Sequence, residues 1–170
     1  VRWLGQKYSI ATDEEAVKNN RIIKPAEPRK LASPLPTLYL DIDKYMMTRL
    51  YTENNVLCKW LKSLPWQQSQ RARIDTVLKN YAVGTAKDSR TIFYQLDEIG
   101  RLHTGKIMRY KDDGHRDKES HPTWVHSVLF QAEIFDFDEW DVETCLYGLH
   151  LLDFAKPKTV NIVESEKTAL

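Results

Sequence analysis

The distribution of proline constrains this chain more than any other feature of its sequence. Four of the seven prolines fall within residues 24–38 (KPAEPRKLASPLPTL). Proline has a fixed φ and no backbone N–H, so this density is incompatible with a helix interior or a central strand. The sequence therefore predicts an N-terminal segment and an extended, Pro-rich linker over residues 1–38, with a folded region after them.

Apolar residues recur at helical spacing between this linker and Gly84. The clearest run is Val56, Leu57, Trp60, Leu61 and Leu64, which follows a candidate cap at Asn54-Asn55 and ends at Pro65-Trp66. A further amphipathic stretch covers residues 67–81. We therefore expect a helical region over 39–84, with two or three helices across about 43–81.

After Gly84 the pattern becomes that of strands. Residues 91–97 (TIFYQLD) and 106–110 (KIMRY) are rich in β-forming side chains, and the segment 98–105 between them contains two glycines. This arrangement favours a hairpin, and the apolar run 124–130 (WVHSVLF) predicts a third strand. Together these strands predict a small antiparallel sheet.

The hydrophobic pattern of residues 139–170, together with the helices and strands above, predicts an α+β fold class. A helix is expected near residues 139–151 and a short apolar strand at 160–163, with a helix opening at Ser165. The expected architecture is a helical N-terminal part followed by a small antiparallel sheet and the first strand of an α/β unit.

Composition excludes several classes of protein. The 170 residues carry 25 Lys and Arg against 24 Asp and Glu, a net charge of +1, so the chain is not a uniform polycation. No stretch approaches the roughly 20 apolar residues of a membrane span. The two distant cysteines, Cys58 and Cys145, cannot form a zinc site, and they favour a reducing, cytoplasmic location. The absence of an initiator Met and the apolar end lead us to expect a piece of a longer protein.

A basic stretch lies in the predicted hairpin. Residues 101–118 contain eight basic side chains against three acids: Arg101, His103, Lys106, Arg109, Lys111, His115, Arg116 and Lys118. Strand alternation puts Lys106, Met108 and Tyr110 on one face. Cations and an aromatic ring on a small sheet are typical of nucleic-acid binding, although a solvated hairpin has the same composition.

Two further patterns carry chemistry of their own. Residues 100–107 (GRLHTGKI) nearly match a phosphate-binding loop, but Ile107 stands where a Mg²⁺-binding hydroxyl is needed, so we expect no nucleotide hydrolysis there. Glu164 follows the predicted strand 160–163, where it would act as an acid or base or help to hold Mg²⁺. A solvent-exposed Glu in a first helical turn explains the same position.

The end of the chain resembles a known family. Residues 160–170 (VNIVESEKTAL) are similar to the first motif of the toprim domain of primases and topoisomerases, an apolar strand that ends in Glu before a helix. Residues 90–110 resemble the segment that precedes toprim in bacterial replicative primases, and residues 121–127 (HPTWVHS) stand at its Pro-aromatic-x-Asn-Ser motif. The region from about 50 to 170 is similar to an uncharacterised primase-related family of mobile-element and plasmid-type proteins.

The resemblance implies roles for particular residues. It places Glu164 at the catalytic Glu of toprim and puts Arg101, Lys106 and Arg109 in the region that contacts template. We add Arg116, Tyr110 and Trp124 as candidate nucleic-acid-binding residues. It also implies a primase-like, β-rich subdomain over 85–155 and the start of a toprim domain over 156–170. Ser165 replaces the usual Gly, and the sequence ends before the position at which toprim domains carry their Asp-x-Asp metal motif.

The resulting hypothesis is a nucleic-acid-binding part of a toprim primase-like protein that acts in DNA replication, primer synthesis or mobile-element DNA processing. The full-length protein would use Mg²⁺ or Mn²⁺, whereas this piece alone would be inactive, bind no cofactor and hold no zinc. Single-stranded DNA or another nucleic acid is the expected partner, with a helicase or replication protein as a second one. A non-catalytic nucleic-acid-binding or protein-interaction module of a mobile element is the alternative.

Overall fold

The structure is a computed structural model that describes residues 34–50, 53–152, 156 and 159–170. The chain divides into two units after Pro34, and the described residues belong almost entirely to the second, Leu35–Leu170. The predicted N-terminal segment and most of the Pro-rich linker lie outside the described residues.

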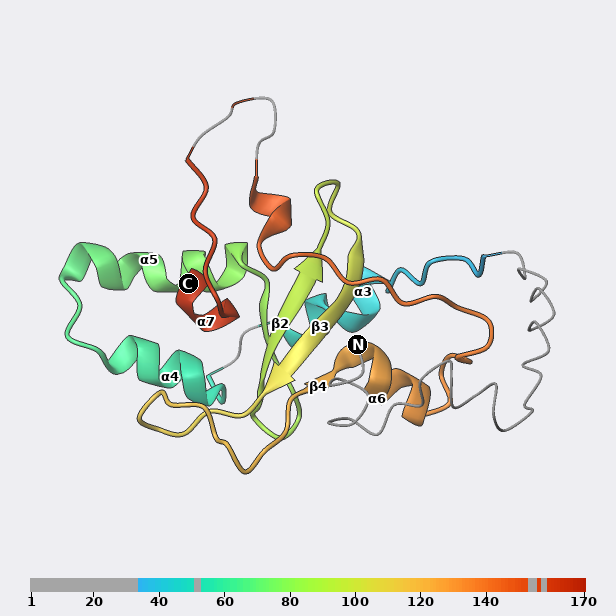
Figure 1. The fold of residues 1–170 in the computed structure, drawn as a ribbon. Helices are drawn as coiled ribbons and strands as arrows, with labels where there is room; N and C mark the ends of the chain where they lie inside the picture. Colours follow the sequence, from blue (N-terminus) through green and yellow to red (C-terminus); the bar gives the residue numbers. More distant parts are fainter. Residues whose placement is uncertain (1–33, 51–52, 153–155, 157–158) are drawn as a thin grey trace, which may run out of the picture. The chain divides into compact units, whose positions relative to one another are not determined.

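Helices form the first part of the second unit. α3 (Ile42–Tyr45) and a 3₁₀ turn, η1 (Met47–Arg49), precede α4 (Val56–Ser63) and α5 (Gln68–Asn80) (Figure 1). The prediction of two or three helices across about 43–81 is therefore confirmed. Asn55 is the N-cap of α4, as the Asn54-Asn55 break predicted, and the helix ends before Pro65. Pro at this position has no N–H to continue the helix.

An antiparallel sheet follows the helices and confirms the α+β fold class. Its strands are β1 (Val83–Thr85), β2 (Thr91–Leu96), β3 (Leu102–Met108) and β4 (Thr123–Trp124), in the order β1-β2-β3-β4. Phe93 pairs with Lys106 and Ile92 with Ile107 in the central β2–β3 ladder. Lys106 therefore lies on the same face of the sheet as Phe93, and Ile107 on the other.

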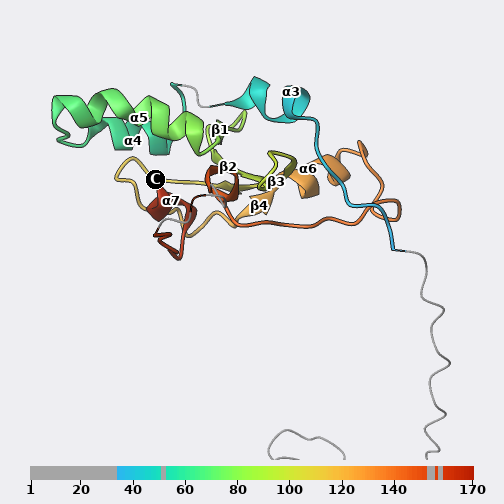
Figure 2. The ribbon, with the colours of Figure 1, turned by 90° about the horizontal axis from the view of Figure 1, so that it is seen from above.

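Both faces of the sheet are covered. Ile92, Tyr94 and Ile107 belong to one buried apolar cluster, which also contains side chains of α3 and α6 (Val125–Gln131). Phe93 and Met108 belong to a second cluster with residues of α4 and α5. Figure 2 shows the central strands between α3 on one side and α7 (Glu166–Ala169) on the other. Two-sided burial explains why β2 reads as an apolar run with no alternation.

The loop of the hairpin is shorter than the sequence predicted, and its second strand begins earlier. β3 begins at Leu102 rather than at residue 106, because the Asp97 carboxylate accepts hydrogen bonds from the backbone N–H groups of Ile99 and Arg101 and closes the turn within 97–101. Gly100 has the positive φ of the turn, +84°. Gly105 is needed for packing instead, since a Cβ there would crowd the side chains of Ile92 and Val125. The near match to a phosphate-binding loop is thus mostly strand.

The predicted strand over 124–130 is wrong. Only Thr123 and Trp124 pair with β3, and the chain then forms α6. Val125 and Leu129, four residues apart, are both buried, which is the spacing of a helix face. A short apolar run does not distinguish a buried strand from a buried helix.

The predicted helix over 139–151 is also wrong. Asp141 pairs in parallel with Thr37: its N–H donates to the Pro36 carbonyl at 3.0 Å, and its carbonyl accepts from the Leu38 N–H at 2.8 Å. Only a 3₁₀ turn, η2 (Leu149–Leu151), remains of the helix. Trp140 and Val142 pack against the first apolar cluster, and the end of the Pro-rich segment supplies the backbone partner of this stretch.

The expected strand at 160–163, the first of an α/β unit, pairs with no strand in the part of the chain that the structure describes. Val160, Ile162 and Val163 are exposed, Ile162 to 88%. The expected helix opening is present, because Ser165 is the N-cap of α7 and its hydroxyl accepts from the Thr168 N–H. Among the described residues, no helix is long and apolar enough to cross a membrane.

We expect Asn55→Ala to be among the most destabilising polar substitutions in the chain. Asn55 is fully buried; its Nδ2 donates to the Gly84 carbonyl and the Thr85 hydroxyl, and its Oδ1 accepts from the Cys58 N–H and the Thr91 hydroxyl. Loss of a cap and of buried partners should lower the free energy of unfolding by about 3 kcal/mol.

Urea unfolding followed by circular dichroism measures this loss. Asn54→Ala is the control, because Asn54 is exposed and adjacent. Equal stabilities of the two variants would contradict the role given to Asn55.

Candidate functional site

The predicted cations on β3 and its flanks have different environments. Arg101 donates from Nε to Asp97 Oδ2 at 2.6 Å, and its guanidinium lies 4.3 Å from the centre of the Tyr39 ring. Lys106 Nζ lies 2.9 Å from Glu166 Oε1. Arg109, by contrast, follows the end of β3, and its Nη2 lies 3.2 Å from Asp88 Oδ2. The sequence did not show that these cations have acidic partners.

Arg101 belongs to a cluster around a buried carboxylate. Asp97 is only 3% exposed and also lies 3.2 Å from His103 Nε2. Burial by itself would raise the pKa of Asp97, but hydrogen bonds from the backbone and side chain of Arg101, from His103 and from the Ile99 N–H outweigh it and lower the pKa to about 2. His103 Nδ1 faces the Glu143 carbonyl at 3.3 Å, which ties the irregular segment to β3. Arg101 therefore has a structural role.

Lys106 lies in a patch with two aromatic rings. It is the cross-strand partner of Trp124, and Trp124 is stacked on His126 with 5.8 Å between ring centres and 20° between planes. Thr104 Oγ1 lies 2.8 Å from His126 Nδ1 and fixes the second ring. Burial lowers the pKa of His126, which favours the neutral ring. Both rings are partly exposed, so the structure brings Lys106 and Trp124 together as a cation beside an aromatic platform.

Tyr110 does not contribute to this platform. Its side chain is 7% exposed and packs edge-to-face on Phe93, with 6.2 Å between ring centres. Burial, together with the nearby Glu166 carboxylate, raises its pKa to about 12. The ring stabilises the second apolar cluster and has no free face for a base.

Four exposed Lys and Arg side chains lie on the loop between β3 and β4. Arg109, Lys111, Arg116 and Lys118 are all exposed. Arg109 Nη2 shares Asp88 with Arg90 at 3.2 Å, whereas Lys111, Arg116 and Lys118 form no ion pair within the described residues. We call these four side chains the loop cations.

This loop is ordered by its own backbone and by α4. Tyr110 and Arg116 form an antiparallel bridge, and the Asp117 N–H donates to the Arg109 carbonyl at 3.0 Å. Gly114, with φ +77°, lies so close to the Trp60 indole that a Cβ would overlap it. Lys167 Nζ donates to the Gly114 carbonyl at 3.0 Å, so α7 also holds the loop. The loop cations are thus presented from a fixed scaffold.

Glu164, the predicted catalytic residue, is exposed and precedes the cap of α7. Among the residues described, no group of three or more His, Cys, Asp or Glu side chains could hold a metal ion. The donor set of this part of the chain therefore does not fit the divalent metals that the toprim resemblance implies. The neighbouring carboxylate, Glu166, is paired with Lys106 and is half-buried rather than available to a metal.

Positive and negative charges are concentrated in different parts of the chain, which the sequence analysis did not predict. Residues 55–118 hold thirteen Lys and Arg against seven Asp and Glu, whereas residues 119–152 hold seven Asp and Glu and neither Lys nor Arg. We call these the basic and the acidic segment. Figure 1 shows α4 and α5 of the basic segment on one side of the strands and α6 of the acidic segment on the other. Charge counts in windows would have revealed this division, which the net charge of +1 conceals.

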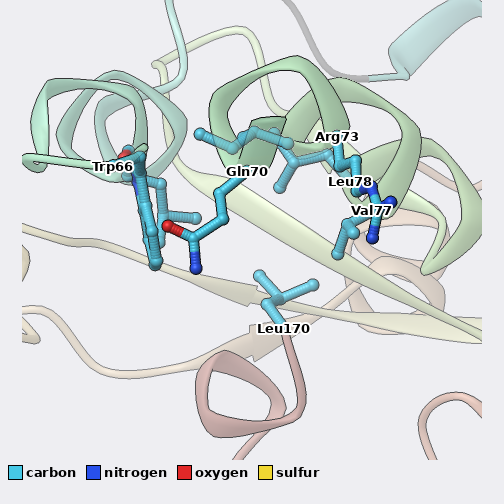
Figure 3. A pocket seen from close by; sticks show the side chains of 8 residues that line it. Trp66, Gln70, Arg73, Val77, Leu78 and Leu170 are labelled. Atoms are coloured by element: carbon cyan, nitrogen blue, oxygen red, sulfur yellow. Dashed lines mark hydrogen bonds between the residues drawn. The ribbon is translucent and has the colours of Figure 1, made fainter. Parts of the chain in front are cut away.

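An apolar cavity of about 220 Å³ lies between α4, α5 and the end of α7 (Figure 3). Trp66 forms one wall and Leu170 faces it from below the two helices, with Gln70 and Arg73 at the rim. The Trp66 indole N–H donates to the Leu61 carbonyl, which fixes the ring. The cavity contains none of the predicted nucleic-acid-binding residues.

Comparison with known proteins gives a family but no activity. Residues 55–170 match the family described as "Domain of unknown function (DUF6371)", and since this match covers more than half of the chain, the chain belongs to that family. No curated protein and no solved structure matches the chain. The comparisons therefore contain no link to primases or toprim proteins.

We expect Asp97→Asn to lower stability in a pH-dependent way. Because the folded pKa of Asp97 is lower than that of an unfolded Asp, its stabilising contribution is complete above about pH 4 and is lost as the pH falls through about 2. The variant should be less stable than the natural chain at pH 7, and the difference should shrink as the pH approaches 2.

Denaturant unfolding at pH 7, 4 and 2.5 measures that difference. Glu98→Gln is the control, because Glu98 is the exposed neighbour. A difference that stays constant across this range would show that the carboxylate charge is not what Asp97 contributes.

Proposed function

We propose that this chain binds single-stranded nucleic acid through the loop cations and the Trp124–His126 platform, as the template-contacting part of a primase-like protein. The observation that carries the proposal is the juxtaposition of exposed cations on an ordered loop with two stacked, partly exposed rings at its base. Trp124 follows the loop directly in β4, so phosphates and bases of one strand can be contacted together.

The loop cations supply the electrostatic part of this interaction. Lys111, Arg116 and Lys118 have no carboxylate to displace within the described residues, so phosphate contacts there release condensed counterions without breaking an ion pair. Lys106 is different, because Glu166 already neutralises it at 2.9 Å. We therefore assign Lys106 a smaller share of the binding than the sequence suggested.

The aromatic platform favours single strands. A base can stack on Trp124 only when it is splayed away from a duplex, and such stacking is sequence-tolerant. Burial lowers the pKa of His126 and so favours the neutral ring, which contributes stacking rather than charge.

The finer assignment rests on the resemblance of residues 90–110, 121–127 and 160–170 to primase segments. In that proposal Glu164 is the acid or base of a toprim site, and the full-length protein uses Mg²⁺ or Mn²⁺ held by carboxylates outside the described residues. The setting would be cytoplasmic DNA replication or mobile-element processing, with a helicase or replication protein as a further partner.

Removal of two loop cations should weaken binding through a change in salt dependence. Four phosphate contacts to a single strand predict a log–log slope of affinity against salt of about −3, and the variant Lys111→Ala/Arg116→Ala should reduce it to about −1.5. Fluorescence anisotropy of a labelled single strand at several salt concentrations measures both slopes.

The control has the same net charge but changes cations outside the basic segment, Lys44→Ala/Lys156→Ala. Its slope should equal that of the natural chain. Equal losses in both variants would show a non-specific charge effect, and no binding at low salt would remove the proposed function.

Substitution of the platform should weaken binding without changing that slope. Loss of stacking on one base corresponds to about 1–3 kcal/mol, so Trp124→Leu should lower affinity by roughly 5- to 150-fold. Trp66→Leu is the matched control, because Trp66 lines the apolar cavity, whose lining contains no residue of the loop. Both variants should first be shown to unfold cooperatively, and an unaffected Trp124→Leu would confine the interaction to charge.

A further inference from the structure

A second surface lies at the turn that follows α6, and the proposed nucleic-acid interface does not use it. A cavity of about 650 Å³ opens there, and its lining includes Phe130, Glu133, Ile134, Asp136, Phe137 and Glu139. Ile134 is 48% exposed and Phe137 60%. Large apolar side chains gathered at one place on a protein commonly mark an interaction site. We call this region the acidic aromatic surface.

The exposed rings of this surface are held in place by the core. Phe137 stacks on the buried Phe130 with 3.6 Å between ring centres and 21° between planes. Phe135 lies 6.5 Å from both Phe130 and Trp140 and extends the aromatic contact inward. Because Phe137 is already ordered, a partner would lose little conformational entropy when it packs against this ring.

The end of α6 positions the rim of the surface. The Glu133 N–H donates to the Phe130 carbonyl at 2.9 Å, and the Ile134 N–H donates to the Leu129 carbonyl at 3.0 Å, which is the hydrogen-bond pattern of a Schellman cap. Glu133 has φ +55° at the position where glycine is usual. The cap sets a carboxylate and an exposed apolar side chain next to each other at the cavity.

Charge defines the partner. Glu133, Asp136 and Glu139 are exposed in the lining, and none of the residues that line the cavity is Lys or Arg. Such a surface repels nucleic acid and anionic lipid and attracts a cationic partner. A second copy of the same surface would bring like charges together across a two-fold interface, which disfavours self-association.

We propose that the acidic aromatic surface docks a basic, amphipathic segment of a partner protein. Apolar side chains of that segment would pack on Ile134 and Phe137, while its Lys or Arg side chains lie beside Glu133 and Glu139. Neither carboxylate forms an ion pair within the described part of the chain. This interaction is independent of the proposed nucleic-acid binding.

The probe is a labelled synthetic peptide with Leu on one face of a helix and Lys on the other. The control peptide keeps every Leu and replaces Lys with Glu. We expect the Lys peptide to bind at low salt, to weaken as salt rises, and to bind at least tenfold more tightly than the Glu peptide.

Two variants of the chain locate the interaction. Phe137→Ala should weaken binding of the Lys peptide by about tenfold, as expected for an aromatic anchor. Glu133→Lys/Glu139→Lys should abolish binding. The matched controls are Val128→Ala, an exposed apolar side chain of α6 outside the cavity, and Glu119→Lys/Glu143→Lys, two exposed acids outside it. Both controls should bind the Lys peptide as the natural chain does.

Three outcomes would overturn the proposal. They are no binding of the Lys peptide to the folded chain, equal losses in variants and controls, and self-association that light scattering detects and Phe137→Ala abolishes, which would make a second copy the occupant. Phe137→Ala should leave single-strand affinity within about twofold of the natural value, so failure here and failure of the proposed function are distinguishable.

Discussion

The buried side-chain amide of Asn55 is the interaction on which the rest of the structure depends. Its donors reach the Gly84 carbonyl and the Thr85 hydroxyl in β1, and its oxygen accepts from the first turn of α4 and from Thr91 in β2. Only an amide can donate and accept in this pattern, since a carboxylate has no donor and an apolar side chain has neither. This one residue fixes the start of α4 against two strands, and the β2–β3 ladder that follows sets which side of β3 carries Lys106.

Local signals predicted the helices well, and long-range pairing explains where prediction failed. Asn55 starts α4 as its N-cap, and Pro65, which has no backbone N–H, marks its end. Both signals can be recognised within a few residues of the sequence. The hairpin loop was predicted to extend to Gly105 because glycine is common in turns. In the structure, glycine is needed at this position because side chains of β2 and α6 leave no room for a Cβ. Periodicity predicts a helix around Asp141, and it fails there because the backbone partners of Asp141, Pro36 and Leu38, are remote in sequence.

The candidate site shows the same limit. Alternation correctly placed Lys106 and Met108 on one face of the sheet, since it follows from strand geometry alone. Whether a cation is available depends on its partner, however, and Glu166 lies in α7, far along the chain from β3. Arg101 is likewise engaged, because Asp97 needs its donors to remain ionised when buried. The composition of the sequence indicates a basic region. The three-dimensional structure is needed to distinguish the cations that stabilise the fold through ion pairs from the loop cations that face solvent.

The separation of charge gives the two proposals a common physical basis. A chain with a net charge of +1 has little long-range attraction for a polyanion, so binding must arise where one sign of charge is concentrated. The acidic segment has no Lys or Arg, so the turn after α6 does not attract phosphates. Phe137 lies there beside carboxylates that favour a cationic partner. The proposed nucleic-acid interface consists of the loop cations, Trp124 and His126, whereas the acidic aromatic surface lies within 130–140, so a nucleic acid and a basic protein segment would not compete for the same side chains. Each would raise the local concentration of the other, which is how a small module can join a nucleic acid to a protein partner without a large interface.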